Sequence, residues 1–229
     1  MRPIRHCPGS REAPAGGPLP PVAGSRGPRL SGVVGLAGIA WIGCVALGMA
    51  ILWNYGLSPG DAAAPPERWP EDSGIPRVPG RPALVLLAHP HCPCTRASLG
   101  ELALLMAQSG GRAQAWVLFV KPKGTAENWD RTDLWSSAAA IPGVSPRRDE
   151  DGAEAARFHA VTSGQVILYG ADGRLLFSGG ITAARGHSGD NPGRDAIVSL
   201  LAGGEAERRK TLVFGCPLHE PVRARAGGL

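Results

Sequence analysis

The sequence predicts an α/β fold: a mixed sheet flanked by helices, preceded by one N-terminal transmembrane helix. Three observations support this prediction. An almost unbroken apolar run from Val33 to Trp53 is long enough to cross a bilayer as a helix. Two apolar runs, residues 83–88 and 113–120, have the composition of buried strands, and a helical pattern separates them. Two further strand patterns are joined by the turn sequence Gly-Ala-Asp-Gly at residues 170–173.

The chain divides into four predicted parts. Residues 1–29 are rich in Pro, Gly and Arg and lack apolar periodicity, so we expect them to be disordered. Residues 30–53 form the transmembrane helix. Residues 54–81 contain many prolines, which favour an extended, semi-rigid linker. Residues 82–229 are numerous enough for one compact domain.

Charge predicts the topology of this single-pass membrane protein. The formal charge is +5, and its excess lies directly before the apolar run. A basic segment there is more typical of membrane orientation than of nucleic-acid binding, so we expect no nucleic-acid partner. No basic residue follows the run until Arg68. The positive-inside rule places the N-terminus in the cytoplasm and the C-terminal domain in the periplasm, outside the inner membrane. A signal peptide cleaved near Ala62–Ala64 is the alternative, but its apolar core would be unusually long.

The predicted domain alternates strands and helices. Residues 83–88 form a strand, and Thr95 is the expected N-cap of a helix over 95–108 that ends at Ser-Gly-Gly. The other elements follow in chain order: a strand at 113–120, short helices at 130–140 and 152–160, strands at 165–169 and 175–178, and a helix from Pro192 to about Ala202. We expect the four strands to share one sheet, with the last two as an antiparallel hairpin.

The candidate site is the motif Cys92-Pro93-Cys94, at the boundary between the first strand and the first helix of the domain. Unpaired backbone N–H groups and the helix dipole favour an anion at such a boundary, so a cysteine there is biased toward thiolate, the reactive form. Pro93 fixes its own backbone angle and stiffens the turn. His89 and His91 flank the motif. Two structural core cysteines are the plainer alternative, but flanking histidines at a helix start are not typical of them.

The element order and the Pro-Cys pair at the first helix resemble a thioredoxin-like fold, in particular the membrane-anchored extracytoplasmic redoxins. The resemblance covers most of residues 82–203 and includes the run from Asp149 to Val161 and the hairpin that follows. More narrowly, three motifs resemble the bacterial RedB-type proteins: His-Pro-x-Cys-Pro-Cys at 89–94, Gly-Gly-Ile-Thr-Ala-Ala-Arg-Gly-His at 179–187 and Phe-Gly-Cys-Pro-Leu at 214–218.

This resemblance implies a thiol–disulfide redox protein that acts on protein thiol partners, with Cys92 and Cys94 as its catalytic pair and no cofactor. Thioredoxins separate their two cysteines by two residues, whereas one residue separates them here, so we expect a strained disulfide that is easily reduced. Cys216 is expected to be either a resolving or a structural third thiol. Three basic side chains could stabilise the thiolate: His89, His91 and Arg96.

A second difference from the family opens a metal-binding alternative. The family has a cis-proline before the hairpin strand, which separates the thiols from metal, and this sequence has Ser163 or Gly164 there. Thiolate and imidazole suit Cu(I), so the alternative function is a copper metallochaperone. Its possible ligands are His89, His91, Cys92, Cys94, His187, Cys216 and His219. We favour the redox function without a metal. The sequence contains no nucleophile elbow and no phosphate-binding loop, which argues against a hydrolase or a nucleotide-binding protein.

Overall fold

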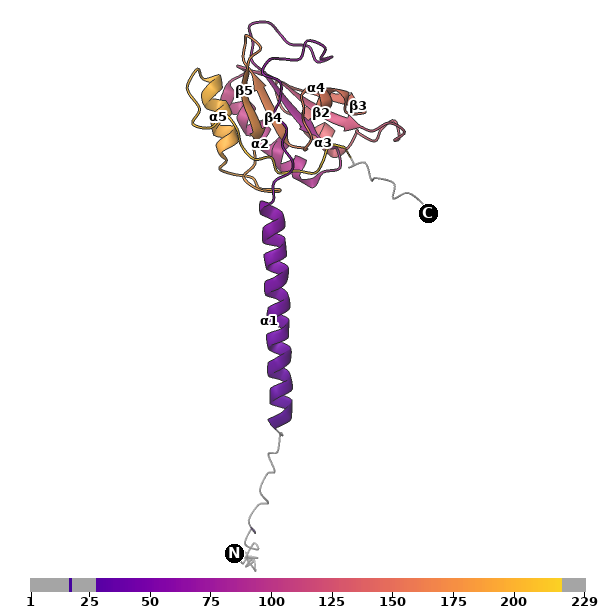
Figure 1. The fold of residues 1–229 in the computed structure, drawn as a ribbon, viewed down its shortest axis with the longest axis vertical. Helices are drawn as coiled ribbons and strands as arrows, with labels where there is room; N and C mark the ends of the chain where they lie inside the picture. The colour runs from indigo at the N-terminus through magenta and orange to yellow at the C-terminus, as the bar shows by residue number, and fades with distance from the viewer. Residues whose placement is uncertain (1–16, 18–27, 220–229) are drawn as a thin grey trace, which may run out of the picture. The chain divides into compact units, whose positions relative to one another are not determined.

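The computed structural model describes residue 17 and residues 28–219 of the chain. The chain divides into two compact units, residues 1–48 and 49–229, and each is described by itself. Helix α1, Pro28–Leu57, contains the predicted transmembrane segment and extends beyond it at both ends (Figure 1). Its part Gly32–Leu57 has a mean hydropathy of 2.1, with the length and composition to cross a membrane. The disorder expected for residues 1–29 falls almost entirely outside the described residues.

The described part of the domain contains one sheet with five strands: β1 (Ala83–Ala88), β2 (Gln114–Lys121), β3 (Val144–Glu150), β4 (Gln165–Tyr169) and β5 (Leu175–Gly180). Their order across the sheet is β3-β2-β1-β4-β5. Strands β1 and β3 run parallel to β2, whereas β4 runs antiparallel to β1 and β5, so the sheet is mixed (Figure 1). This confirms that the four expected strands share one sheet and that the last two form an antiparallel hairpin.

Strand β3 was not predicted, because its sequence is charged and contains a proline. It pairs with β2 along its whole length, from Val144 opposite Ala115 to Glu150 opposite Lys121. An edge strand needs one paired side only, so it tolerates proline and exposed charges that an interior strand would not. Pairing with β2 and burial of Val144 at the start of the strand outweigh its weak strand propensity.

Four helices cover the two faces of the sheet: α2 (Pro93–Ser109), α3 (Asp133–Ala139), α4 (Ala153–Arg157) and α5 (Pro192–Leu201). Side chains of β1 alternate between the faces, as strand geometry requires. Leu84 and Leu86 pack with apolar residues of α2, α3 and α5, whereas Val85 and Leu87 face α4. Burial on both faces explains why the sequence of β1 is apolar throughout.

Part of the Pro-rich segment, predicted as an extended, semi-rigid linker over residues 54–81, lies on the domain. Trp69 packs edge-on against Phe158 and Tyr169, with ring centroids 5.1 and 5.3 Å apart. Ile75 is buried on the same face. The backbone N–H of Gly60 donates to the carbonyl oxygen of Val213 at 2.8 Å. Burial of these apolar side chains stabilises an extended segment that its proline content alone would leave free.

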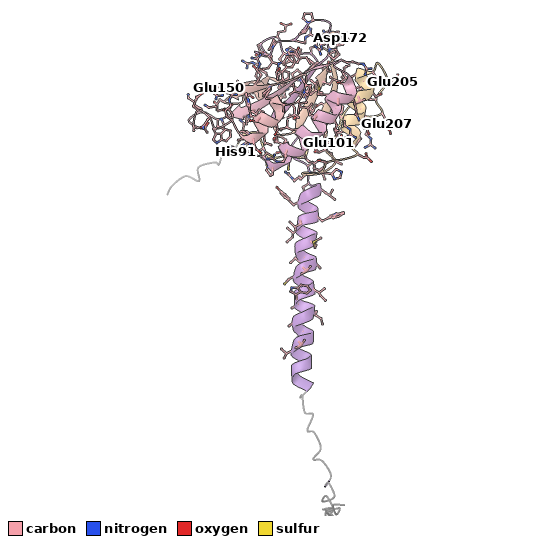
Figure 2. The ribbon with its side chains drawn as sticks, turned by 180° about the vertical axis from the view of Figure 1, so that it is seen from behind. His91, Glu101, Glu150, Asp172, Glu205 and Glu207 are labelled. Atoms are coloured by element: carbon pink, nitrogen blue, oxygen red, sulfur yellow. The ribbon has the colours of Figure 1, made fainter. Side chains whose placement is uncertain are left out.

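A buried charge pair joins α2 to the start of α5. Glu101 of α2, labelled in Figure 2, is 1% exposed and forms a 2.6 Å salt bridge with Arg194. The same carboxylate accepts hydrogen bonds from the Asn191 side chain at 2.9 Å and from the backbone N–H of Gly189 at 2.8 Å. Asn191 is also the N-cap of α5, and its side chain accepts a hydrogen bond from the backbone N–H of Arg194. The pair therefore fixes the segment that follows β5 against the helix that carries the candidate site.

Candidate thiol site

The motif Cys92-Pro93-Cys94 forms the first turn of α2, directly after β1. Helix α2 begins at Pro93 with Cys92 as its N-cap, two residues before the predicted start at 95. Proline favours the first helical position because its fixed backbone angle suits the helix and its missing N–H is not needed there. Thr95 is therefore not the N-cap. Its hydroxyl instead donates to the carbonyl oxygen of His89 and lies 2.9 Å from the Ser163 hydroxyl.

Among the three cysteines of the site, Cys92 has a lowered thiol pKa, whereas the pKa values of Cys94 and Cys216 are raised. Burial alone would raise the pKa of its thiol. Hydrogen bonds from the thiol and the backbone N–H of Cys216, and then the N–H groups of Thr95 and Cys94, outweigh burial and lower the pKa of Cys92. The side chain of Cys92 makes no regular capping hydrogen bond, so the two helical N–H groups act mainly as partial positive charges beside the sulfur.

Cys216 reaches this position because the segment Gly215–Leu218 runs antiparallel beside residues 161–163. The backbone N–H of Ser163 donates to the carbonyl oxygen of Cys216 at 2.8 Å, and that of Leu218 donates to Val161 at 2.9 Å. Leu218 is buried in the apolar cluster on the α4 face of the sheet. Burial and the hydrogen bond and charge of Cys92 raise the pKa of Cys216 to about 12, so the Cys216 thiol stays protonated at neutral pH.

Arg185 is a member of the site that the sequence analysis did not identify. Burial and the charge of Cys92 raise the pKa of Cys94, and the charge and hydrogen bond of Arg185 offset part of that increase. The same guanidinium donates to the carbonyl oxygen of Gly215 at 2.8 Å. Arg185 therefore links Cys94 to the segment that carries Cys216. Its position within the run 179–187 contributed to the family resemblance, but no local pattern indicates which sulfur a distant arginine will contact.

Ser163 occupies the region where the family has its cis-proline. Its hydroxyl accepts a 2.9 Å hydrogen bond from the backbone N–H of His89. Gly164 follows with a positive φ of 89° and donates its N–H to Leu87 at 2.7 Å. Residues 28–219 contain no cis peptide bond. The polar Ser163 side chain thus connects the end of β1 to the segment before β4, directly behind the cysteine motif.

The histidines and arginine next to the motif face other partners. The His91 ring, labelled in Figure 2, packs edge-on against Trp129 with centroids 4.6 Å apart, and one of its nitrogens is 3.1 Å from the Trp129 carbonyl oxygen. The His89 ring also lies edge-on to Trp129, at 5.4 Å. Arg96 forms an exposed ion pair with Asp133. The groups that lower the pKa of Cys92 most are backbone N–H groups and Cys216, rather than these three basic side chains.

The structure does not gather the ligand set of the copper alternative. His219 packs on Gly152, where an added Cβ would lie 2.0 Å from its ring, and its charge acts on Asp149. His187 is exposed in the loop before α5. In the described part of the chain, no group of three or more His, Cys, Asp or Glu side chains is arranged to hold a metal ion. The three cysteines come together, whereas the His91 ring contacts Trp129 and the His219 ring packs on Gly152.

No protein-family model and no curated protein matches the chain. Among solved structures, it is similar to an uncharacterized conserved protein from Geobacillus kaustophilus, with a TM-score of 0.53 and 16% identity over 73% of this chain and 95% of that chain. A hypothetical protein from Sinorhizobium meliloti 1021 gives a TM-score of 0.51 with 18% identity, over 61% of this chain and 79% of that chain. A secreted Mycobacterium tuberculosis disulfide oxidoreductase homologous to E. coli DsbE gives 0.41 with 18% identity, over 55% and 83%.

At sequence identities of 16% and 18%, the similarity to these structures shows a shared fold only. The mixed five-stranded sheet, the helices on both of its faces and the first helix starting directly after β1 give the chain a thioredoxin-like fold. A long apolar N-terminal helix precedes this domain. The predicted fold class is therefore confirmed.

Proposed function

We propose that the protein is a membrane-anchored, extracytoplasmic thiol–disulfide oxidoreductase in which Cys92 is the attacking thiolate. The observation that carries this proposal is the environment of Cys92. Its sulfur lies at the start of α2, two other thiols hydrogen-bond to it, and its pKa is lowered despite burial. Thiol–disulfide exchange requires a thiolate and a second sulfur within reach, and the cluster contains both.

The reaction proceeds in two exchanges. The Cys92 thiolate attacks one sulfur of a disulfide in a partner protein, forms a mixed disulfide and releases the other sulfur as a thiolate. A second thiol of the cluster then loses its proton to that thiolate or to solvent and attacks the Cys92 sulfur. The partner leaves as a dithiol, and this protein keeps a disulfide. The same steps in reverse would oxidise a partner dithiol, so the direction depends on the reduction potential of each partner.

The membrane anchor and the compartment follow from the sequence and from α1. Arginines before α1 and none directly after it favour a cytoplasmic N-terminus and a periplasmic catalytic domain. Disulfide chemistry is typical of that compartment. The three motifs at 89–94, 179–187 and 214–218 support a RedB-type protein as the narrower class. They meet in space as well, because Cys94, Arg185 and Cys216 all belong to the site.

Reaction of the full-length chain with oxidised glutathione in detergent tests the proposal. Intact-mass spectra of the reduced protein should show mixed disulfide and then internal disulfide. Cys92→Ser should abolish both products at the domain, because the activated sulfur is lost. Cys44→Ser is the matched control, since Cys44 is an exposed cysteine of α1 and should leave the reaction unchanged. Wild-type rates in Cys92→Ser would overturn the proposal.

A further inference from the structure

We propose that Cys216, rather than Cys94, is the resolving thiol, so that the catalytic disulfide joins Cys92 to the C-terminal segment Gly215–Leu218. This inference rests on the proposed thiol–disulfide exchange at Cys92 and assigns the second sulfur of that reaction. Both Cys94 and Cys216 hydrogen-bond to Cys92, so the assignment depends on which sulfur can form a bond with it without breaking the structure around it.

The geometry of α2 disfavours a bond between Cys92 and Cys94. The two residues are separated only by Pro93, at the start of a helix. Cys92 is the N-cap, with an extended backbone (φ −85°, ψ 118°), whereas Cys94 already lies in the first helical turn, and the single residue between them, Pro93, has a fixed backbone angle. A disulfide requires the two Cβ atoms to lie about 3.5–4.5 Å apart with their bonds directed toward each other. Closing this short ring would therefore unwind the first turn of α2.

Cys216 approaches Cys92 from a different segment, so no such unwinding is needed. Its side chain and its backbone N–H both contact the Cys92 sulfur. The hydrogen bond from Ser163 to the Cys216 carbonyl oxygen fixes the position of this residue along the chain. Cys94 has a competing partner, since its sulfur is also hydrogen-bonded to Arg185. These contacts hold Cys216 ready for attack and hold Cys94 aside.

The backbone at Gly215 is matched to this role. A Cβ at Gly215 would lie 1.8 Å from the carbonyl oxygen of Ser163, so only glycine allows the segment to come this close. Arg185 binds the carbonyl oxygen of the same residue. Since φ at Gly215 lies outside the left-handed region, close approach rather than an unusual backbone conformation is what requires glycine.

Access of a partner to Cys92 requires movement, because Cys92 is 1% exposed. The segment Gly215–Leu218 is the element best placed to move. Two backbone hydrogen bonds to residues 161–163, the Arg185 contact and the buried Leu218 side chain attach it to the domain, and it belongs to no regular helix or strand. Lifting it would uncover Cys92 for the first exchange, and its return would bring Cys216 back for the second.

The atoms balance in this scheme. Attack by Cys92 breaks the partner's S–S bond, forms a mixed disulfide and releases one partner thiolate. The Cys216 thiol gives its proton to that thiolate or to solvent, attacks the Cys92 sulfur and releases the second partner thiolate. The products are a partner dithiol and a Cys92–Cys216 disulfide. A dithiol donor of the extracytoplasmic compartment must then reduce this disulfide by the same two exchanges.

Disulfide mapping tests the inference in the full-length chain with Cys7 and Cys44 replaced by serine. After reaction with oxidised glutathione and alkylation, trypsin leaves Cys92 and Cys94 on one peptide, residues 78–96, and Cys216 on a peptide that begins at Thr211. We expect the two peptides to be linked, and the link to persist in Cys94→Ser. In Cys216→Ser the mixed disulfide with glutathione should accumulate, because the resolving sulfur is lost.

The outcomes separate the two proposals. An unlinked Thr211 peptide together with an internal disulfide within 78–96, or loss of the link in Cys94→Ser, would overturn the role of Cys216 and leave the redox function intact. Exchange that survives in Cys92→Ser would overturn the redox function itself. The mapping on the protein with all three site cysteines decides between the two resolving thiols even if Cys216→Ser proves unstable.

Discussion

Substitution of Gly215 by alanine tests whether the close approach of the C-terminal segment holds the site together. The added Cβ would lie 1.8 Å from the Ser163 carbonyl oxygen and 2.8 Å from its carbon, so the backbone has to shift. Overpacking of this kind costs about 1–3 kcal/mol. Full detachment would lose the burial of Leu218, about 1.5–3 kcal/mol, and two backbone hydrogen bonds at about 0.5–1.5 kcal/mol each. Detachment is therefore the more expensive response, and we expect a displaced but attached segment.

The displacement should show in stability and in chemistry. We expect Gly215→Ala to lower the free energy of unfolding by about 1–3 kcal/mol. For a domain of this size each kcal/mol lowers Tm by about 2–4 °C, which tryptophan fluorescence of the full-length chain in detergent can follow. The pKa of Cys92 should rise, because the Cys216 groups that lower it move away. The pH dependence of Cys92 alkylation measures this change.

Gly100→Ala is the matched control. Gly100 lies on the exposed side of α2, with no atom within 4 Å of an added Cβ, so alanine should stabilise the helix by about 0.5–1 kcal/mol. Alkylation of Cys92 should be unchanged in this variant. If Gly215→Ala matched wild type in both Tm and alkylation, the segment would not be held against Ser163 as described, and the assignment of Cys216 would lose its structural basis.

Cys216→Ala removes the thiol that donates a hydrogen bond to Cys92, so the pKa of Cys92 should rise. The midpoint of the pH dependence of Cys92 alkylation should therefore move to higher pH. Cys216→Ser keeps a donor and should stay near wild type, and equal midpoints in all three proteins would contradict the assigned hydrogen bond. Glu101→Ala removes the buried partner of Arg194 and leaves it only the exposed Asp195, so it should lower the free energy of unfolding by about 3–5 kcal/mol, measured by urea denaturation. A loss below about 1 kcal/mol would show that the pair contributes little. A reporter that is active only in the periplasm, fused after Leu229, should be active, whereas cytoplasmic activity would reverse the proposed orientation.

The fold was predictable where hydrophobic pattern and local geometry agree. The run at 83–88 is apolar because both faces of β1 are covered, and the turn at 170–173 joins β4 to β5 as expected. Strand β3 was not predictable, because pairing with β2 rather than its own composition makes it a strand. Packing of Trp69 on the sheet was missed for a related reason, since prolines around it indicate an extended segment but not what that segment contacts.

The candidate site was predictable only in part. Cys92 and Cys94 are recognisable because a motif at a strand-to-helix boundary is a local feature. The structure adds that Cys216 contacts Cys92. More than a hundred residues separate Cys216 from the motif, so no local sequence pattern indicates this contact. Arg185 is hidden in the same way. The surroundings of His91 were also not predictable, because being next to a cysteine in sequence does not fix the direction of a side chain, and the His91 ring contacts Trp129.

Ser163 and Gly164 show what the chain gains from having no proline before β4. Proline has no backbone N–H, yet both of these residues use theirs, Ser163 toward Cys216 and Gly164 toward Leu87. A proline at position 163 would remove the hydrogen bond to the carbonyl oxygen of Cys216, which holds this residue next to the site. A proline at position 164 would remove the hydrogen bond to the carbonyl oxygen of Leu87 near the end of β1. The backbone N–H of Ser163 thus attaches the segment that carries Cys216 at a position where proline could not do so. On the proposed scheme, a Cys92–Cys216 disulfide would tie the segment Gly215–Leu218 covalently to the start of α2, whereas in the dithiol form hydrogen bonds and the buried Leu218 side chain hold it there.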